Sequence, residues 1–200
     1  MPLQNRVDPY GRLIAVPDRG TMMGNRGLLH NDKRQVVRNH CGVRWICCVR
    51  EFKGRRDPVM TPGLYTRLFF LDEATALAAG HRPCAECRRP SYNAFLAAWS
   101  RAHPGNWPAP AVDAVLHRER MAPRREIPFD ELPPGAMIEW DGQPYLVRSD
   151  SLWLWTPGGY TTRVERPTGQ SVRLLTPVSI VNTIGEGYVP NIGMLLTSLL

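Results

Sequence analysis

Apolar side chains at helical spacing mark the middle of the chain. A helix is predicted over Ser91–Arg101, because apolar residues recur there at i, i+3, i+4 and i+7. These residues are Tyr92, Phe95, Leu96 and Trp99. Similar spacing over Val112–Arg120 predicts a second helix. A shorter helix, Glu73–Ala79, is predicted between Asp72, a favourable N-cap residue, and Gly80, which suits the position after a helix end. Two more short helices are expected, one through Lys33–Asn39 and one that begins after Thr176 and ends before Gly185.

Strand patterns precede these helices. Val43–Phe52 is rich in β-branched and aromatic residues, and successive side chains of a strand point to opposite faces. Cys47 is therefore expected on the same face as Trp45, and Cys48 on the opposite face. Leu64–Leu71 predicts a second strand, which we expect to pair directly with the first.

The pattern changes after residue 126 to short strands separated by turns. Ala136–Trp140 and Pro144–Arg148 flank Asp141-Gly142, a dipeptide typical of two-residue hairpin turns. Further strands are predicted from the apolar runs that follow; these are Leu152–Trp155, Tyr160–Glu165 and Ser171–Leu175. We therefore expect residues 127–200 to form a small antiparallel β-meander or barrel.

A linker rich in proline and arginine, Ala122–Arg125, separates the two patterns. The prediction is an α+β protein of two separable domains. Residues 1–122 form a basic domain with an irregular N-terminal arm, and residues 127–200 form the β domain. The length of 200 residues suits either two small domains or one large one.

Charge is unevenly distributed along the chain. Residues 1–101 hold 17 Lys or Arg against 8 Asp or Glu, whereas residues 102–200 hold 8 against 10, which together give the net charge of +7. A basic half that consists mainly of arginine favours contacts to phosphate. No apolar run reaches the length of a membrane span, and the N-terminus lacks an apolar signal core, so we expect no membrane partner and a cytoplasmic location.

Cysteine spacing gives the clearest sign of chemistry. Cys84 and Cys87 form a Cys-x-x-Cys pair just before the predicted helix, a spacing that lets one tight turn point both thiolates at a single ion. Structural zinc takes four ligands. Cys48 is the third candidate, because Cys47 lies on the more apolar strand face. For the fourth, His30 is preferred over Cys41, and His40 is a weaker alternative.

A resemblance enters with these residues. Phe69–Pro90, which runs from a Phe-Phe strand through an alanine-rich helix to Gly-His-Arg-Pro-Cys-x-x-Cys, resembles the metal-binding domain of the bacterial alkylation-repair protein Ada. The likeness covers about residues 45–99 and implies a zinc-bearing, treble-clef-like unit with a role on DNA. The family spaces its first two cysteines by three residues, but Arg44 stands four positions before Cys48 here, so methyl transfer does not carry over.

The sequence therefore predicts a zinc-binding protein that binds nucleic acid, with DNA favoured over RNA as the partner. The phosphate contacts are expected from basic residues around the cysteines, namely Arg44, Arg50, Lys53, Arg55, Arg56, Arg88 and Arg89.

Two other functions remain open. An HNH-type nuclease would use imidazoles such as His30 and His81 with a carboxylate such as Asp32 or Glu86. An interaction module would grip its partner with aromatic side chains of the β region, namely Trp140, Trp153, Trp155 and Tyr160.

Overall fold

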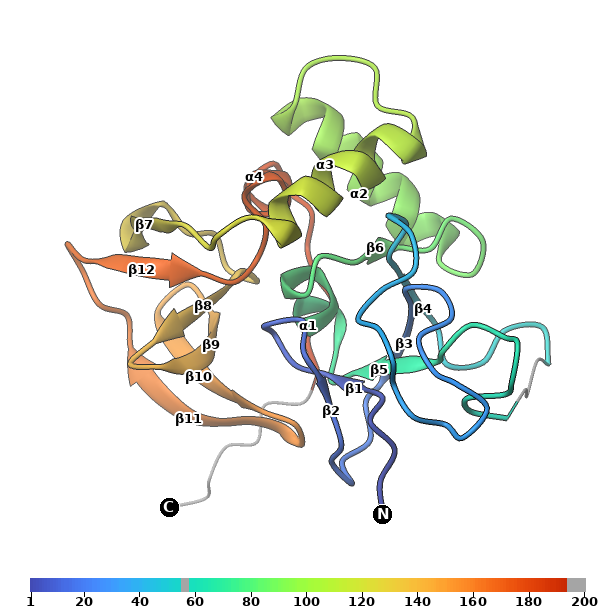
Figure 1. The fold of residues 1–200 in the computed structure, drawn as a ribbon. Coiled ribbons are helices and arrows are strands. Elements are labelled where there is room, and N and C mark those ends of the chain that lie inside the picture. Colours follow the sequence, from blue (N-terminus) through green and yellow to red (C-terminus); the bar gives the residue numbers. More distant parts are fainter. Residues whose placement is uncertain (55–57, 194–200) are drawn as a thin grey trace.

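The chain folds into two β-sheets with helices between and beside them (Figure 1). The computed structural model describes residues 1–54 and 58–193. Within these ranges it is an α+β protein with two six-stranded sheets and four α-helices. No helix in the described part of the chain is both long and apolar enough to cross a bilayer.

The first sheet belongs to the N-terminal half, and its strands follow the order β2-β1-β5-β3-β4-β6. The strands are β1 (Arg6–Val7), β2 (Leu13–Ile14), β3 (Met22–Asn25), β4 (Ile46–Cys48), β5 (Leu68–Phe70) and β6 (Arg82–Pro83). The predicted segments Val43–Phe52 and Leu64–Leu71 therefore form strands of only three residues each.

The expected direct pairing of those two segments is wrong, because β3 lies between β4 and β5 and pairs with both. Gly24 in β3 explains how the strand fits there. A Cβ atom at that position would lie 2.1 Å from Cε2 of Phe70, so the Phe70 ring occupies the space that any other side chain would need.

Three of the helices predicted before residue 122 are confirmed, within a few residues at each end. They are α1 (Glu73–Ala78), α2 (Arg89–Ala102) and α3 (Ala109–Met121), and a fourth helix, α4 (Val178–Gly185), lies near the C-terminus. The short helix expected at Lys33–Asn39 is wrong, because these residues form turns and bends and an isolated bridge pairs Val36 with His30. Asp72 caps α1 as expected, since its carboxylate accepts a hydrogen bond of 2.8 Å from the backbone N–H of Thr75. Every residue of α1 is buried, so this short helix is a central element of the core.

The second sheet is antiparallel throughout, with the order β11-β10-β9-β8-β12-β7. Its strands are β7 (Glu126–Pro128), β8 (Met137–Trp140), β9 (Gln143–Val147), β10 (Ser151–Thr156), β11 (Gly159–Glu165) and β12 (Ser171–Leu174). The hairpin predicted around Asp141-Gly142 is present, with Trp140 paired to Gln143. Asp141 and Gly142 both have positive φ, as a type I′ turn requires.

Apolar residues from the two halves pack into shared clusters. One cluster joins α1 to the second sheet, where Leu71 and Ala78 pack with Trp153 and Tyr160. Another joins α2 and α3 to α4 and the segment after it; its buried members are Leu77, Phe95, Ala98, Trp99, Val112, Leu116, Ile180, Ile184 and Tyr188. The linker Ala122–Arg125 does lie between α3 and β7, but this packing does not support the expectation of separable domains.

The shared clusters predict one cooperative unfolding transition. We expect thermal melts followed by far-UV circular dichroism and by tryptophan fluorescence to coincide at fixed metal concentration. A fragment of residues 1–122 should fail to fold, because it lacks Ile180 and Ile184 and leaves Trp99 exposed to water. Two separate transitions, or a native-like spectrum for the fragment, would contradict this expectation.

Candidate metal centre

Three cysteines meet at one end of the first sheet. Cys48 ends β4, Cys84 follows β6, and Cys87 lies in the turn before α2. Their sulfur atoms all lie within 4.8 Å of one another, close enough to bind a single metal ion. The predicted grouping of these three residues is confirmed.

Backbone pairing brings the cysteines together. β4 and β6 run parallel, with Ile46 opposite Arg82 and Cys47 opposite Pro83. The backbone N–H of Cys84 then donates to the carbonyl of Cys47 at 2.9 Å, which sets Cys84 beside Cys48. The carbonyl of Cys84 accepts from the N–H of Arg88 at 3.1 Å and closes the turn that carries Cys87.

The neighbouring cysteine points the other way, as strand alternation predicts. Cys47 is fully buried in an apolar cluster with Leu68 and Phe70. Burial raises the pKa of its thiol, so Cys47 stays neutral and acts as a core residue.

The three clustered sulfurs influence one another strongly. Hydrogen bonds from the Cys48 thiol and from nearby backbone N–H groups lower the pKa of Cys84 to about 5. The pKa of Cys48 is raised, first because its thiol donates to Cys84 and second because it is buried. Burial also raises the pKa of Cys87. A bound metal ion would offset the repulsion among three thiolates.

The fourth ligand expected from the sequence does not join this cluster, which has three members among the described residues. His30 is buried elsewhere, with Nδ1 2.6 Å from Oγ1 of Thr66 and Nε2 3.2 Å from the carbonyl of Thr61. Both ring nitrogens are therefore already engaged.

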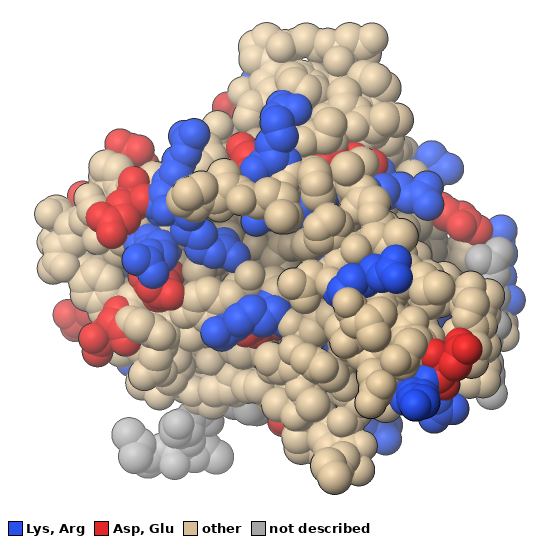
Figure 2. Space-filling model, viewed as in Figure 1, with Lys and Arg blue, Asp and Glu red and all other residues tan. Residues whose placement is uncertain are grey.

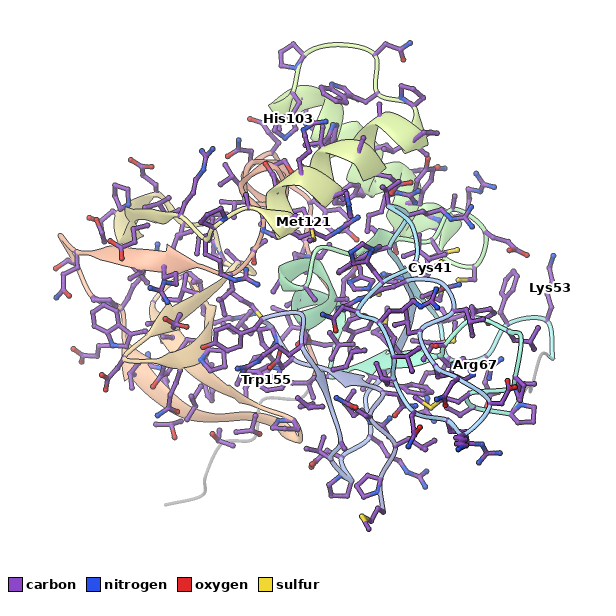
Figure 3. All side chains as sticks on the ribbon, in the orientation of Figure 1. Cys41, Lys53, Arg67, His103, Met121 and Trp155 are labelled. Carbon is purple, nitrogen blue, oxygen red and sulfur yellow. The ribbon has the colours of Figure 1, made fainter. Side chains whose placement is uncertain are left out.

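The alternative fourth ligands lie outside the cluster too. Cys41 is exposed on the loop before β4 (Figure 3). His40 packs against Trp45 and His117, with ring centroids 5.7 and 5.3 Å apart.

A hollow of about 480 Å³ opens beside the three cysteines. Its wall includes the side chains of Arg44, Arg50, Phe52 and Tyr65. A metal ion held by the three sulfurs could therefore take a further ligand from solvent, as ions in metal sites with an open coordination position do.

The predicted phosphate-contacting residues fall into three groups. Arg44, Arg50, Lys53 and Arg89 are exposed, and Lys53 points outward at the edge of the molecule (Figure 3). Arg55 and Arg56 lie outside the described residues. Arg88 is buried, so the prediction that it contacts phosphate is wrong for this structure.

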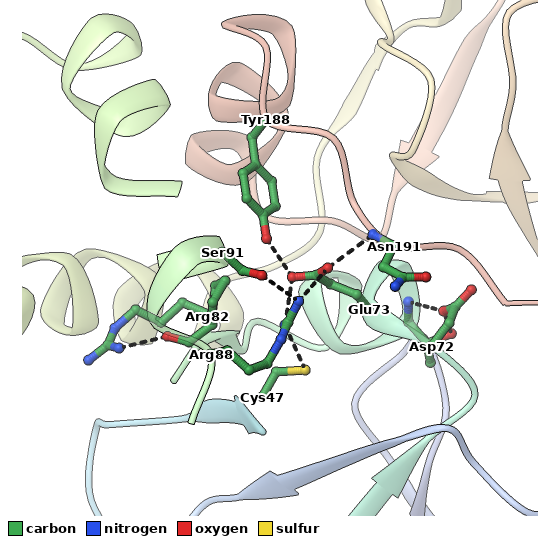
Figure 4. A network of polar contacts seen from close by, with 10 residues as sticks. Cys47, Asp72, Glu73, Arg82, Arg88, Ser91, Tyr188 and Asn191 are labelled. Carbon is green, nitrogen blue, oxygen red and sulfur yellow. Dashed lines mark hydrogen bonds and ion pairs between the residues drawn. The ribbon is translucent and has the colours of Figure 1, made fainter. Parts of the chain in front are cut away.

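The side chain of Arg88 points inward, toward the buried carboxylate of Glu73 (Figure 4). Its guanidinium forms a two-pronged ion pair with Glu73, with N–O distances of 2.7 and 2.8 Å. The Glu73 carboxylate also accepts from the Tyr188 hydroxyl and from the backbone N–H of Asn191 at 3.0 Å. Arg88 further donates to Ser91 at 3.1 Å, so α1, α2 and the C-terminal segment meet at one ion pair.

Sequence reasoning missed this pair and a second basic group around Arg26. Arg26 is almost fully buried within the segment that was interpreted as an irregular arm. One feature of the sequence could have indicated that Glu73 is buried. It is the acidic residue at the start of a helix whose other residues are mostly apolar. No comparable signal marks Arg26.

Comparisons of the chain with protein-family models, with curated protein sequences and with solved structures found no match. The likeness of residues 45–99 to the Ada metal-binding domain therefore depends on the residues of the motif alone.

The buried ion pair predicts a large effect of a single substitution. Changing Glu73 to Ala should lower the free energy of unfolding by about 3–5 kcal/mol, because Arg88 is then left as an uncompensated buried charge. Urea denaturation followed by circular dichroism measures this. The matched control is Glu186→Ala, which removes an ion pair that is about half exposed, 3.7 Å from Arg101; its effect should be far smaller. Equal losses for the two variants would show that the pair does not stabilise the fold.

Proposed function

We propose that this chain is a zinc-binding protein that binds nucleic acid, with DNA as the first candidate, through the basic surface beside the cysteine cluster. The observation that carries the proposal is the convergence of three sulfur atoms within 4.8 Å of one another. A thiolate site needs a reducing compartment, and the cytoplasm is the location we propose.

Zinc is the metal that the donor set favours. Thiolate ligands select zinc, copper(I) or iron–sulfur clusters, and zinc is the usual occupant where a strand and a Cys-x-x-Cys turn before a helix supply the sulfurs. Cys48 on β4 and the Cys84–Cys87 turn before α2 supply them in this order. This arrangement supports a treble-clef-like unit, and the resemblance to the Ada domain supports the same assignment.

Nucleic acid is favoured by what surrounds the cysteines. Arg44 and Arg50 line the same hollow as the three sulfurs, and the exposed Lys53 and Arg89 extend the positive charge around it. Phe52 and Tyr65 in the hollow offer aromatic faces on which unpaired bases can stack. Basic groups beside aromatic rings are the combination that single-stranded nucleic acid requires.

The two alternative functions find less support. A nuclease needs an accessible imidazole, but His81 is fully buried and its Nε2 accepts a hydrogen bond of 3.1 Å from Arg26. An interaction module needs exposed aromatic side chains, but Trp153, Trp155 and Tyr160 are buried in the cluster that joins the second sheet to α1.

Metal content provides the first test. Protein purified without chelators should contain about one zinc ion per chain by elemental analysis. Cys87→Ser should lose the metal and unfold more easily, because a structural ion contributes directly to folding free energy. Cys41→Ser is the matched control, since Cys41 is exposed and outside the cluster, and it should keep the metal. Folded wild-type protein that contains no metal would sink the assignment.

Salt dependence of DNA binding provides the second test. Replacing Arg44, Arg50 and Lys53 together by Ala should weaken binding and flatten the slope of log affinity against log salt by roughly two to three units, because each lost phosphate contact removes about one released counterion. A control variant with the same charge change replaces exposed arginines elsewhere, at Arg101, Arg163 and Arg173. Fluorescence anisotropy across a salt series measures both, and zinc content should stay unchanged. Identical slopes for the two variants would refute the proposed surface.

A further inference from the structure

A second cavity, of about 640 Å³, lies away from the cysteines. It opens between the C-terminal end of α3, the turn between β1 and β2, and the end of β12. None of the three clustered cysteines is part of its wall. Basic side chains lie around the hollow beside α3 on the face drawn in Figure 2, which has the orientation of Figure 1.

Arg26 forms the floor of this cavity and is 1 % exposed. Its Nε donates to Nε2 of His81 at 3.1 Å, and its Nη1 donates to the carbonyl of Gly11 at 2.9 Å. Nη2 is buried and has no hydrogen-bond partner among the described residues. A buried cationic donor without a hydrogen-bond partner is costly for the folded state, and a bound anion would remove that cost.

Arg120 adds a second guanidinium to the same wall. It donates to the carbonyl of Gly80 at 2.8 Å and to that of Val43, while its buried Nε lacks a partner in the described structure. The guanidinium carbons of Arg26 and Arg120 lie 4.0 and 4.1 Å from the centre of the Trp45 ring. Two positive groups thus share one aromatic side chain at the cavity wall.

Neither guanidinium forms an ion pair with a carboxylate among the described residues. Glu119 is the acidic residue of the described wall, and its carboxylate already accepts hydrogen bonds from the hydroxyl and the N–H of Ser179. Asp8, close by, is held by Arg12 at 2.6 Å. Burial and the nearby Arg120 lower the pKa of Arg26 to about 9, and the charge of Asp8 offsets part of this shift.

The rim of the cavity is positively charged as well. Arg38 and Arg125 are exposed there. Arg124 donates to the carbonyls of Leu175 and Tyr10 and so bridges the two halves of the chain at the cavity edge. Apolar wall residues such as Leu13 leave room beside the cations for an uncharged part of a ligand.

We propose that this cavity is a phosphate-binding site, in which Arg26 and Arg120 hold the phosphate group of a phosphorylated small molecule. Guanidinium groups match the geometry of phosphate oxygens, and a doubly charged anion suits a pair of cations of which Arg26 is buried and Arg120 is half-buried. The volume is within the range of cavities that bind molecules of nucleotide size. The site is independent of the cysteine cluster and does not depend on the proposed zinc or DNA binding.

The test uses the full, metal-loaded chain and isothermal titration calorimetry at constant ionic strength. The probes are inorganic phosphate, adenosine 5′-monophosphate and adenosine. We expect the two phosphates to bind with dissociation constants below the millimolar range, and adenosine not to bind. Wild type that binds neither phosphate, or binds adenosine equally well, would overturn the proposal.

Variants assign the site. Arg26→Met should weaken phosphate binding by about tenfold or more, the usual effect of losing a hydrogen bond to a charged group. Because Arg26 is buried, a second variant keeps the test decisive should the first fail to fold: Arg38→Ala combined with Arg125→Ala should weaken binding by about two- to fivefold. Its charge-matched control replaces the exposed residues Lys33 and Arg118 by Ala, outside the cavity wall. Equal affinities for the rim and control variants would overturn the assignment.

Competition identifies the source of the phosphate. A short single-stranded DNA that displaces the nucleotide, and that binds the rim variant more weakly, would overturn the assignment to a small molecule and make the cavity part of the DNA-binding surface. A DNA that leaves nucleotide binding unchanged identifies a free phosphate monoester. Because zinc content and the salt slope of DNA binding are measured separately, failure of this site leaves the proposed function untouched.

Discussion

The ion pair between Glu73 and Arg88 is the interaction on which the rest of the structure depends. Burying two opposite charges removes both from water, which costs free energy. The bidentate contact and the further hydrogen bonds that the Glu73 oxygens accept offset this cost. Arg88 follows Cys87 directly in sequence, so the pair also fixes the turn that carries two of the clustered sulfurs. The ion pair between Glu73 and Arg88 therefore holds both the core and the turn of the cysteine cluster in place.

The sequence allowed the helices and the grouping of the cysteines to be predicted because both follow from local periodicity. The apolar spacing around Phe95 and Trp99 is long and regular, and it corresponds to α2. Strand alternation alone separated Cys48 from Cys47, although the strand itself has only three residues. Five strands of the second sheet were predicted too, because turns such as Asp141-Gly142 carry clear residue signals. The strand β7 and the pairing of β12 with β8 were not predicted, so the sheet is not the simple meander that was expected.

The features that sequence did not reveal depend on partners far away in the chain. His30 is a plausible zinc ligand by type, but its ring is held by Thr66 and Thr61, and no local pattern predicts those contacts. Arg88 looks like a surface residue beside Arg89 until Glu73 is placed opposite it. The pairing of β3 between β4 and β5 depends on the fit of Gly24 against Phe70, which is a property of the assembled sheet.

The parallel pairing of β4 with β6 has a consequence for how an ion enters and leaves the cysteine cluster. In many small metal domains the ion itself closes the loop between distant ligands, and the chain entropy lost in that closure weakens binding. Here the hydrogen bond from Cys84 to Cys47 and the packing of the cysteines against Met23 and Tyr65 have already brought the ligands together. The three sulfurs already lie within 4.8 Å of one another, so a metal ion that binds there would need little further ordering of the chain.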